Sequence, residues 1–450
     1  MADQEPTATS IFHIYSRTRA WVRFFIVMVA TTILPVATAQ AQTFTVLHAF
    51  ADGADGAHPF SGVAIDRSGT VYGVTYSGGY TGGICAFPYG SAGCGVVFKL
   101  VHRGSGWTFT PIYSFTGPPD GAYAAGVVVG ADGSLYGTTY GGGSTGQGNC
   151  LLGANGCGTV FNMRPPPNPC ITVFCPWDET VIYRFSGTNG DGDTPYNGDL
   201  VFDSEGSIYG TTEVGGGAYG AGIVYKLTAS HGSWAESILY SFDTSGSGWG
   251  EPQSGVIFDP AGNLYGTVIQ GGGVYQLTPS QSGWTGRLLQ AFNTCTDGCG
   301  TEGGVVMDAA GNLYGATTSY GPNGGGTAYE LLASQGWSLN LVYSFTGNSN
   351  LGGVGPADKL TMDAAGNLYG TTQAEGFGYG TVFKLTPSGG SWTYTDLHSF
   401  TGGKDGAFPY GSVAIDSHGN LYGTTEAGGD LSQCPAFDGS GCGVVWKITP

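Results

Sequence analysis

The sequence predicts an all-β fold, a seven-bladed β-propeller closed by pairing of the N-terminal strand with the last blade. Three observations predict it. One module recurs seven times, each module contains four short β-rich runs, and the chain enters a module at its fourth run and leaves another at its third. Four-stranded units repeated in this way are typical of propellers, whose sheets surround a central channel. The expected domain spans residues 42–450.

The first two runs, strands A and B, flank the pattern Asp-x-x-Gly-x-Φ-Tyr-Gly, where Φ is Val, Leu or Ile. Its tyrosines mark the seven modules: Tyr72, Tyr136, Tyr209, Tyr265, Tyr314, Tyr369 and Tyr422. Six have an aspartate six residues upstream: Asp66, Asp203, Asp259, Asp308, Asp363 and Asp416. Aspartate accepts N–H groups at the start of a turn and glycine adopts the left-handed conformation, so the pattern predicts a hairpin. We expect these aspartates to be structural, and the glycine after each tyrosine to lie beneath an aromatic ring.

The third run, strand C, follows a glycine-rich loop of variable length, as in Gly380–Pro387. Strand D ends in Tyr-Ser-Phe or a variant, at Phe50, Phe115, Phe185, Phe242, Phe292, Phe345 and Phe400. A tryptophan precedes six of these by eight residues: Trp107, Trp177, Trp234, Trp284, Trp337 and Trp392. Each run is short, rich in β-forming residues and bounded by turn residues, which predicts strands.

The termini indicate how the ring closes. After residue 41 the chain begins with a strand D, Phe44–Phe50, and it ends with a strand C, Gly443–Thr449. The first strand is therefore expected to complete the last blade, which removes the unpaired edges that promote aggregation.

The N-terminal segment has the layout of a secretory signal peptide, residues 1–41. Arg17, Arg19 and Arg23 precede an uncharged apolar run, Phe24–Val36, and small residues follow it. An uncleaved anchor is the alternative, although the run is short for a membrane span and contains Pro35. We expect a secreted or cell-surface protein with no membrane span in the mature chain.

The ten cysteines fall into five close pairs: Cys85 and Cys94, Cys150 and Cys157, Cys170 and Cys175, Cys295 and Cys299, Cys434 and Cys442. An even number of locally paired cysteines after a signal peptide predicts disulfides. A zinc site would need Cys-x-x-Cys or a Cys/His cluster, and the sequence has neither.

The repeated segments resemble the GloVer family of exported bacterial tandem-repeat (choice-of-anchor) proteins. The segments are Gly-Asn-Leu-Tyr-Gly-Thr-Thr (366–372), Val-Phe-Lys-Leu-Thr-Pro (382–387) and Leu-Tyr-Ser-Phe (239–242), and the likeness covers 43–450. The resemblance implies export and surface association, and it supplies no catalytic residues. Family members often end in a C-terminal anchor, which this sequence does not show.

The charge and the motifs exclude several functions. The net charge is −18 and the 14 Lys and Arg residues are scattered, whereas nucleic-acid binding needs clustered positive charge. The sequence contains no His-Glu-x-x-His motif and no phosphate-binding loop. A glycosidase whose carboxylates come from different blades stays possible.

The candidate binding residues lie on the face formed by the B–C loops and the blade-to-blade connections. The B–C loops of modules 1, 2 and 7 are long and carry predicted disulfides, and long ordered loops are often functional. The candidates are Tyr76, Tyr140, Asp52, Asp55, Asp120 and Asp405. Asp191 and Asp193 are candidate ligands for Ca²⁺, the one cofactor considered, because it prefers oxygen ligands. Ordinary solvated Asp-Gly turns are the alternative for all these aspartates.

We therefore expect an exported, monomeric, non-catalytic propeller that presents this loop face to a glycan, a peptide or a surface protein. One alternative is a secreted carbohydrate-active or lactone-cleaving enzyme with a metal near the channel mouth. A second is a purely architectural envelope protein.

Overall fold

The computed structural model describes residues 42–450, apart from 82–84, 86–92, 145–149, 167–176, 197–198, 218–219, 246–247, 348–354, 357, 375–377, 433 and 435–439. Residues Thr43–Thr449 form one compact unit. The predicted signal peptide and the predicted pair Cys170 and Cys175 lie outside the described residues, so both stay predictions.

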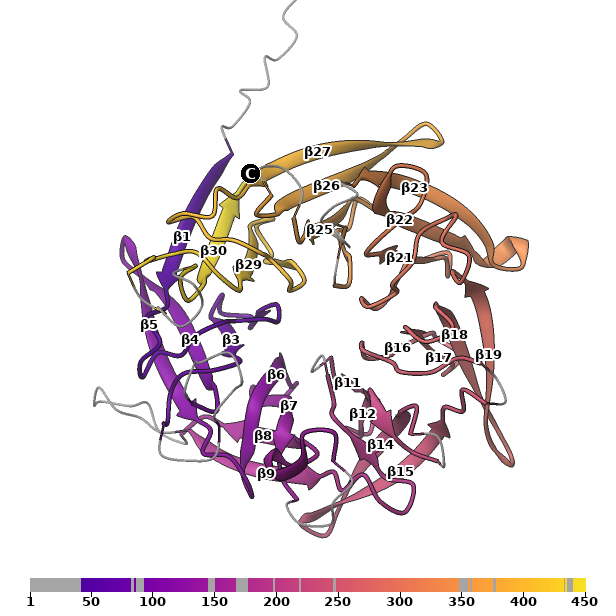
Figure 1. The fold of residues 1–450 in the computed structure, drawn as a ribbon, viewed down its shortest axis with the longest axis horizontal. Helices are drawn as coiled ribbons and strands as arrows, with labels where there is room; N and C mark the ends of the chain where they lie inside the picture. Colours follow the sequence, from indigo (N-terminus) through magenta and orange to yellow (C-terminus); the bar gives the residue numbers. More distant parts are fainter. Residues whose placement is uncertain are drawn as a thin grey trace, which may run out of the picture. The chain divides into compact units, whose positions relative to one another are not determined.

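The described residues form seven four-stranded antiparallel sheets around a central channel, as predicted (Figure 1). The strands of each blade are given from the innermost strand A to the outermost strand D: blade 1 contains β2 (Ala64–Ile65), β3 (Val71–Thr75), β4 (Val96–Arg103) and β5 (Gly106–Ser114), and blade 2 contains β6 (Gly121–Val129), β7 (Leu135–Gly142), β8 (Thr159–Arg164) and β9 (Asp178–Arg184). Blade 3 contains β11 (Val201–Phe202), β12 (Ile208–Thr212), β14 (Ile223–Ser230) and β15 (Ser233–Ser241), blade 4 contains β16 (Ile257–Phe258), β17 (Leu264–Val268), β18 (Gly273–Ser280) and β19 (Gly283–Ala291), and blade 5 contains β20 (Val306–Met307), β21 (Leu313–Thr317), β22 (Gly324–Leu332) and β23 (Ser338–Thr346). Blade 6 contains β24 (Thr361–Met362), β25 (Leu368–Thr372), β26 (Thr381–Ser388) and β27 (Ser391–Ser399), and blade 7 contains β28 (Ala414–Ile415), β29 (Leu421–Thr425), β30 (Val444–Thr449) and β1 (Thr43–Ala49). The remaining elements are the pair β10 (Gly192–Asp193) and β13 (Val214–Gly215) and the 3₁₀ helices η1 (Gly153–Asn155) and η2 (Ala333–Gln335).

The ring closes through β1, as the termini predict. β1 pairs antiparallel with β30, from Thr43 opposite Thr449 to Ala49 opposite Val444. The N–H of Phe50 then donates to the carbonyl of Gly443 at 3.0 Å. Because the first and last strands share one sheet, no blade is left with three strands.

The repeated aspartate holds the A–B hairpin and strand B together. In blade 6, Oδ1 of Asp363 accepts the N–H groups of Ala365 and Asn367 at 2.9 Å, and Oδ2 accepts the hydroxyl of Tyr369 at 3.0 Å. The hydroxyl contact recurs at 3.0–3.3 Å for Tyr72, Tyr209, Tyr265, Tyr314 and Tyr422. The six-residue spacing in the sequence is therefore a hydrogen bond across the turn.

The Tyr-Gly step and the repeated tryptophan are packing devices. A Cβ on Gly73 would lie 2.5 Å from the ring of Phe98, and every equivalent glycine lies similarly beneath a strand C aromatic side chain. Trp177 of blade 2 packs on Tyr72 of blade 1, with ring centroids 5.8 Å apart. Three further tryptophans contact the strand B tyrosine of the preceding blade in the same way: Trp107, Trp337 and Trp392. The tryptophans thus join neighbouring blades.

Candidate functional site at the channel mouth

The two ends of the propeller differ in their construction. The A–B and C–D turns lie at one end, here called the hairpin end. The B–C loops and the connections from strand D to the next strand A lie at the other, here called the loop end. The candidate site is built where the loop end meets the channel.

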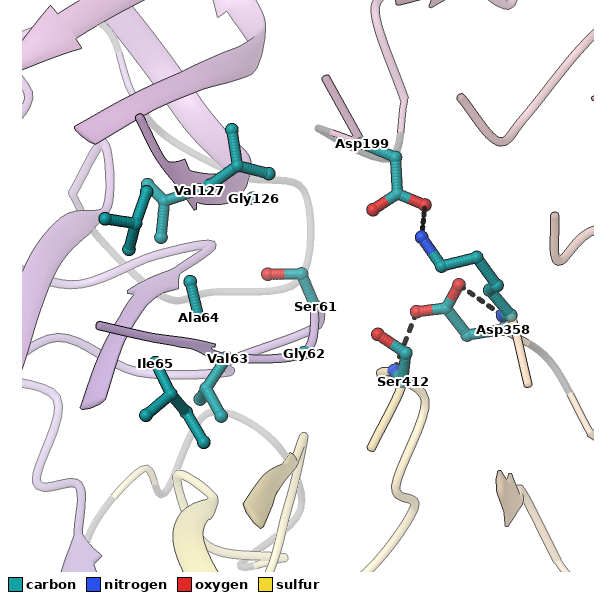
Figure 2. A pocket seen from close by; sticks show the side chains of 13 residues that line it. Ser61, Gly62, Val63, Ala64, Ile65, Gly126, Val127, Asp199, Asp358 and Ser412 are labelled. Atoms are coloured by element: carbon teal, nitrogen blue, oxygen red, sulfur yellow. Dashed lines mark hydrogen bonds and ion pairs between the residues drawn. The ribbon is translucent and has the colours of Figure 1, made fainter. Parts of the chain in front are cut away.

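The channel wall just inside the loop end consists of the residues that enter each strand A. Small residues fill this position in most blades, but blades 3 and 6 carry Asp199 and the pair Asp358 and Lys359. The ammonium of Lys359 lies 3.0 Å from Oδ2 of Asp199. Blades 3 and 6 are not neighbours, so this ion pair spans the channel. The carboxylate of Asp358 accepts the N–H of Ser412 at 2.7 Å (Figure 2).

Burial and the neighbouring charges shift the pKa values of the groups at this ion pair. Burial, together with the charge of Asp199, raises the pKa of Asp358 to about 6. Burial lowers the pKa of Lys359, but the two carboxylates outweigh that effect and raise the pKa overall. Lys359 is therefore charged at neutral pH.

A cavity of about 270 Å³ adjoins the ion pair. Its lining combines inner-strand segments of blades 1 and 2 with polar groups from blades 3, 6 and 7: Ser61–Ile65, Gly126–Val129, Asp199, Asp358, Lys359 and Ser412. The cavity is thus mainly apolar on the side of blades 1 and 2 and polar on the side of blades 3, 6 and 7 (Figure 2).

Aromatic side chains from different blades meet above this cavity. Phe60 stacks on Tyr410 with ring centroids 4.7 Å apart and an interplanar angle of 18°. Phe60 also meets the edge of Tyr196 at 6.4 Å, and Tyr196 meets Tyr140 at 5.6 Å. Phe60 belongs to blade 1 and Tyr196 to blade 3, and side chains of non-adjacent blades meet only near the axis. We call Phe60, Tyr140, Tyr196 and Tyr410 the mouth aromatics.

Three glutamates share this position. Glu213 accepts a hydrogen bond from Nε2 of Gln253 at 2.6 Å, and Glu302 accepts one from the hydroxyl of Thr318 at 3.3 Å. Burial raises the pKa of both carboxyl groups, and it raises the pKa of Glu426 to about 7.

The glutamates and the mouth aromatics form one electrostatic unit. Burial and the nearby charges of Glu213 and Glu302 raise the pKa of the Tyr196 phenol. Burial together with Glu426 and Glu302 raises the pKa of Tyr410 to about 12. These pairs connect blades 3, 5 and 7, which again places the groups around the axis. The mouth can accept hydrogen bonds from a ligand and cover its apolar faces.

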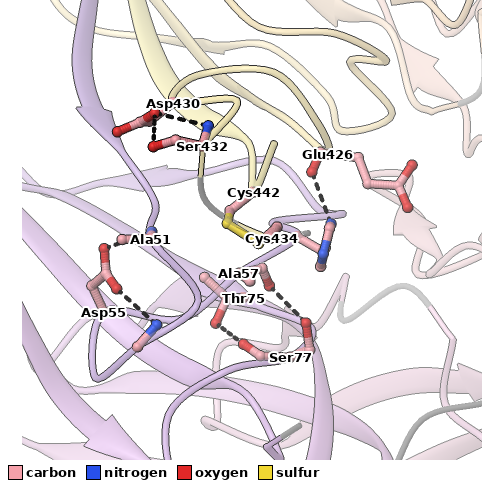
Figure 3. Close-up of a disulfide and its surroundings, with 12 residues drawn as sticks. Ala51, Asp55, Ala57, Thr75, Ser77, Glu426, Asp430, Ser432, Cys434 and Cys442 are labelled. Atoms are coloured by element: carbon pink, nitrogen blue, oxygen red, sulfur yellow. Dashed lines mark hydrogen bonds between the residues drawn. A yellow bond between two sulfur atoms is a disulfide. The ribbon is translucent and has the colours of Figure 1, made fainter. Parts of the chain in front are cut away.

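A histidine side chain of the neighbouring blade contacts the backbone of Glu426. Nδ1 of His58 lies 3.1 Å from the carbonyl of Glu426. The disulfide Cys434–Cys442 closes the same B–C loop, and the Glu426 side chain points away from it (Figure 3). The B–C loop of blade 7 is therefore held near its start by the contact with His58 and near its end by the disulfide.

Four predicted disulfides are confirmed, and all four lie at the loop end: Cys85–Cys94, Cys150–Cys157, Cys295–Cys299 and Cys434–Cys442. The first, second and fourth close B–C loops, and the third closes the connection from blade 4 to blade 5. They rigidify the segments that surround the mouth.

The structure separates the predicted binding residues into two groups. Tyr140 is a mouth aromatic, and Tyr76 lies close enough to Tyr140 for the two phenols to interact electrostatically. The aspartates instead lie in the blade-to-blade turns. Asp55, Asp120 and Asp405 accept hydrogen bonds from, or pair with, a strand D side chain of the preceding blade: His48 at 3.0 Å, Tyr113 at 3.1 Å and His398 at 3.2 Å respectively.

Asp52 stands in the same turn as Asp55, and burial together with the charge of Asp55 raises its pKa. The structure does not bring these four aspartates to the mouth. The hydrogen bonds of Asp55, Asp120 and Asp405 are those of turn residues.

The predicted calcium ligands are also engaged within the protein. Asp191 accepts the N–H and the hydroxyl of Ser186 at 2.7 and 2.6 Å. Asp193 accepts the N–H of Leu151 at 2.6 Å, and burial raises its pKa to about 6. Ligand-type atoms within 4.8 Å of its carboxylate include those of Cys150 and Cys157, whose sulfurs are bonded to each other. Calcium binding by Asp191 and Asp193 stays a prediction.

Sequence reasoning missed most of the mouth, although one signal could have found it. The residue four positions after the repeated strand B tyrosine takes five identities across the seven blades, whereas the strand itself is repeated: Tyr76, Tyr140, Glu213, Ile269, Thr318, Gln373 and Glu426. In five blades a second variable position lies two residues after a non-glycine residue whose φ is positive: Phe60, Ala125, Tyr196, Gln253 and Tyr410. Variation between otherwise repeated modules marks the surface that the repeat leaves free for a ligand.

The family of the chain follows from its repeats. The model of the Gloeobacter/Verrucomicrobia repeat matches residues 32–273 and 269–450. The chain belongs to this repeat family. The predicted resemblance is thereby confirmed, and no curated protein sequence matches the chain. The described residues contain no helix that is long and apolar enough to cross a membrane.

Several solved structures have similar folds. PorZ, a surface component of the type-IX secretion system of Porphyromonas gingivalis, shares 14% identity at a TM-score of 0.45, over 87% of this chain and 46% of PorZ. The gluconolactonase XC5397 of Xanthomonas campestris shares 12% at 0.41, over 91% and 89%.

A GH74 xyloglucanase of the same organism, Xanthomonas campestris, shares 13% identity at a TM-score of 0.48, over 85% of this chain and 53% of the enzyme. The repeat-family chain thus spans about half the length of PorZ and of the xyloglucanase. These likenesses concern the fold alone.

Proposed function

We propose that this repeat-family protein is an exported binding protein that holds a neutral glycan chain at the loop-end mouth of its channel. One observation carries the proposal: side chains from non-adjacent blades bring four aromatic rings and three glutamates together at the axis. Aromatic rings cover the apolar faces of sugar rings, and carboxylates accept hydrogen bonds from their hydroxyl groups.

The charge of the mouth favours a neutral or amino-bearing glycan over an anionic one. None of the variable mouth positions carries Lys or Arg, and the whole chain has a net charge of −18. A phosphate- or sulfate-bearing ligand would meet unfavourable potential there. This also separates the proposal from nucleic-acid binding.

The surface around the mouth is suited to a ligand longer than the mouth itself. Among the described residues, five of the six exposed large hydrophobic side chains lie in B–C loops: Tyr80, Leu151, Tyr320, Tyr379 and Leu431. Exposed apolar side chains gathered on one face mark interaction surfaces. The four disulfides of the loop end support an oxidising, extracellular setting for it.

The test is binding of purified residues 42–450 to an array of neutral oligosaccharides, followed by titration calorimetry. Tyr410→Ala and Glu213→Gln are expected to weaken binding roughly tenfold or more. Ile238→Ala, an exposed apolar residue on outer strand β15, is the control and should bind like the wild type. Absence of binding to every neutral glycan by the folded protein would refute the proposal, as would unchanged binding by both mouth variants.

Glycan cleavage is a second candidate, favoured by one observation. Burial raises the pKa of Glu426 to about 7, so this carboxyl group can donate a proton at neutral pH. Its proton would pass to the glycosidic oxygen as the bond to the anomeric carbon breaks. Water would add its hydroxyl group to that carbon and give its proton to a second mouth glutamate. Release of reducing ends that is lost in Glu426→Gln, with binding retained, would establish this function.

A further inference from the structure

The strongest unexplained group in the channel is the hydroxyl of Ser61. Ser61 is only 6% exposed, and its hydroxyl has no hydrogen-bond partner among the residues that the structure describes. A buried hydroxyl without a partner loses the free energy of its hydrogen bonds to water, so such groups are rare unless something else occupies the space beside them.

The repeat itself shows why Ser61 is unusual. Ser254 occupies the equivalent position in blade 4, five residues before the hairpin aspartate, and its hydroxyl lies 2.8 Å from the hydroxyl of Thr267 in strand B. Blade 1 has Val74 where blade 4 has Thr267. Ser61 therefore has no such partner within its blade, and it is one of the residues that line the cavity.

Ser61 and the ion pair both line this cavity. In Figure 2 the Ser61 hydroxyl points toward the side of Ala64 and Val127, whereas Asp199 and Asp358 lie on the other side. Lys359 uses one of its three N–H donors for Asp199. The cavity thus offers a hydroxyl group, an ammonium and a carboxylate around an apolar wall, in about 270 Å³.

The cavity begins directly below the mouth aromatics. Phe60 precedes Ser61, and Tyr410 stands two residues before Ser412, which also lines the cavity. A chain that stacks on Phe60 and Tyr410 can therefore continue into the channel. The Asp199–Lys359 ion pair crosses the channel at this depth and limits how far it can go.

We infer that this cavity receives the terminal residue of the glycan, so that the protein recognises a chain end rather than an internal segment. The inference rests on the proposed function. A sugar ring matches the cavity because it carries hydroxyl groups around its edge and apolar C–H groups on its faces. Ser61, Lys359 and Asp199 bind the hydroxyl groups, and Val127 with Ala64 covers a face of the ring.

The experiment compares short and long probes of the same sugars. The probes are linear hexasaccharides of β-1,4-xylose, β-1,4-mannose, β-1,3-glucose and α-1,4-glucose, together with the methyl glycoside of each sugar. We expect one hexasaccharide to bind residues 42–450 and the methyl glycoside of its sugar to compete for part of that binding. Ser61→Ala should weaken both roughly tenfold. Tyr410→Ala should weaken the hexasaccharide and leave the methyl glycoside unchanged.

Ser254→Ala is the matched control, because its hydroxyl is already paired with Thr267. It should bind both probes like the wild type. If a hexasaccharide binds but no methyl glycoside competes, or if Ser61→Ala binds like Ser254→Ala, the chain-end inference is wrong and the proposed function stands. If none of these hexasaccharides and no glycan of the array binds the folded protein, both the proposed function and the chain-end inference are wrong.

Discussion

The hairpin end and the loop end of the propeller are stabilised in opposite ways. At the hairpin end, six blades repeat one aspartate that binds its own turn and the tyrosine six residues later. At the loop end the blades differ from one another, and four disulfides hold the segments in place. Repeated side chains thus build the scaffold, and the unrepeated ones are available for a ligand.

The comparison predicts that the largest losses of stability come from the repeated residues. Trp177 is 6% exposed and packs on Tyr72 of the preceding blade. Trp177→Ala is expected to lower the free energy of unfolding by about 3–5 kcal/mol, because it leaves a cavity between two blades. Chemical denaturation measures this. Tyr80→Ala, at an exposed loop-end residue, should change stability by less than about 0.5 kcal/mol, and an equal loss in both would contradict the comparison.

The disulfides of the loop end should contribute the next largest effect. Cys434→Ser with Cys442→Ser opens a link between residues 8 apart, and the expected loss is about 2–3 kcal/mol from the entropy of the unfolded chain. The equivalent double variant of Cys295 and Cys299, which are 4 apart, should lose less. Thermal unfolding of the two variants tests the order, and a reversed order would show that native-state contacts dominate.

The two ends should also respond to pH in opposite directions. Burial raises the pKa of Glu426 at the loop end from 4.5 to about 7, so the folded protein keeps a proton that the unfolded chain releases. The resulting stability is complete below pH 4.5 and is lost as the pH rises through 7. Glu426→Gln is therefore expected to gain about 2 kcal/mol over the wild type at pH 8 and little at pH 4.5.

The hairpin end shows the reverse sign at Asp203. Burial opposes ionisation of this carboxyl group, but hydrogen bonds from Ser207 and Lys226, among others, together outweigh burial and lower its pKa to about 2. The stability it contributes is present above pH 3.8 and is lost as the pH falls through 2. Unfolding temperatures should be measured for both variants between pH 2 and pH 8. Asp203→Asn should change the acid limb of the curve of unfolding temperature against pH, and Glu426→Gln should change its alkaline limb. A change of the same limb by both variants would disprove this assignment.

The smallest effect is expected from a single turn of the hairpin end. Asp363→Ala removes the acceptor of the Ala365 and Asn367 N–H groups and of the Tyr369 hydroxyl. The free energy of unfolding should fall by about 1 kcal/mol, because water replaces most of these hydrogen bonds at an exposed turn. Asp363→Asn, which keeps an acceptor for the N–H groups, should lose less. Glycan binding should not change in either variant, and a loss of binding would remove the division between the two ends.

Local spacing explains which parts of the fold could be predicted. The hairpin hydrogen bond from Tyr369 to Asp363 and the packing of Phe383 on Gly370 both arise between residues close in sequence or paired in one sheet. Repetition of these contacts therefore predicted strands, blade number and ring closure. Disulfides were predictable for the same reason, since each described pair spans at most nine residues.

The candidate site could be predicted only in part. Tyr140 was identified as a loop-face residue and does lie at the mouth. Glu302, Phe60 and Tyr196 were not identified, because each is a single residue in a different blade and no local pattern connects them. The turn aspartates were favoured instead because Asp-Gly pairs are conspicuous in sequence, but their carboxylates are used within the turns.

The sequence by itself determined a seven-bladed, disulfide-linked propeller of the Gloeobacter/Verrucomicrobia repeat family, because those features depend on interactions that recur within each module. Only the tertiary structure decided that Phe60 meets Tyr196 and that Lys359 reaches Asp199. These contacts join blades that are not neighbours. They exist only at the axis of a closed ring, where residues far apart in the chain are brought together.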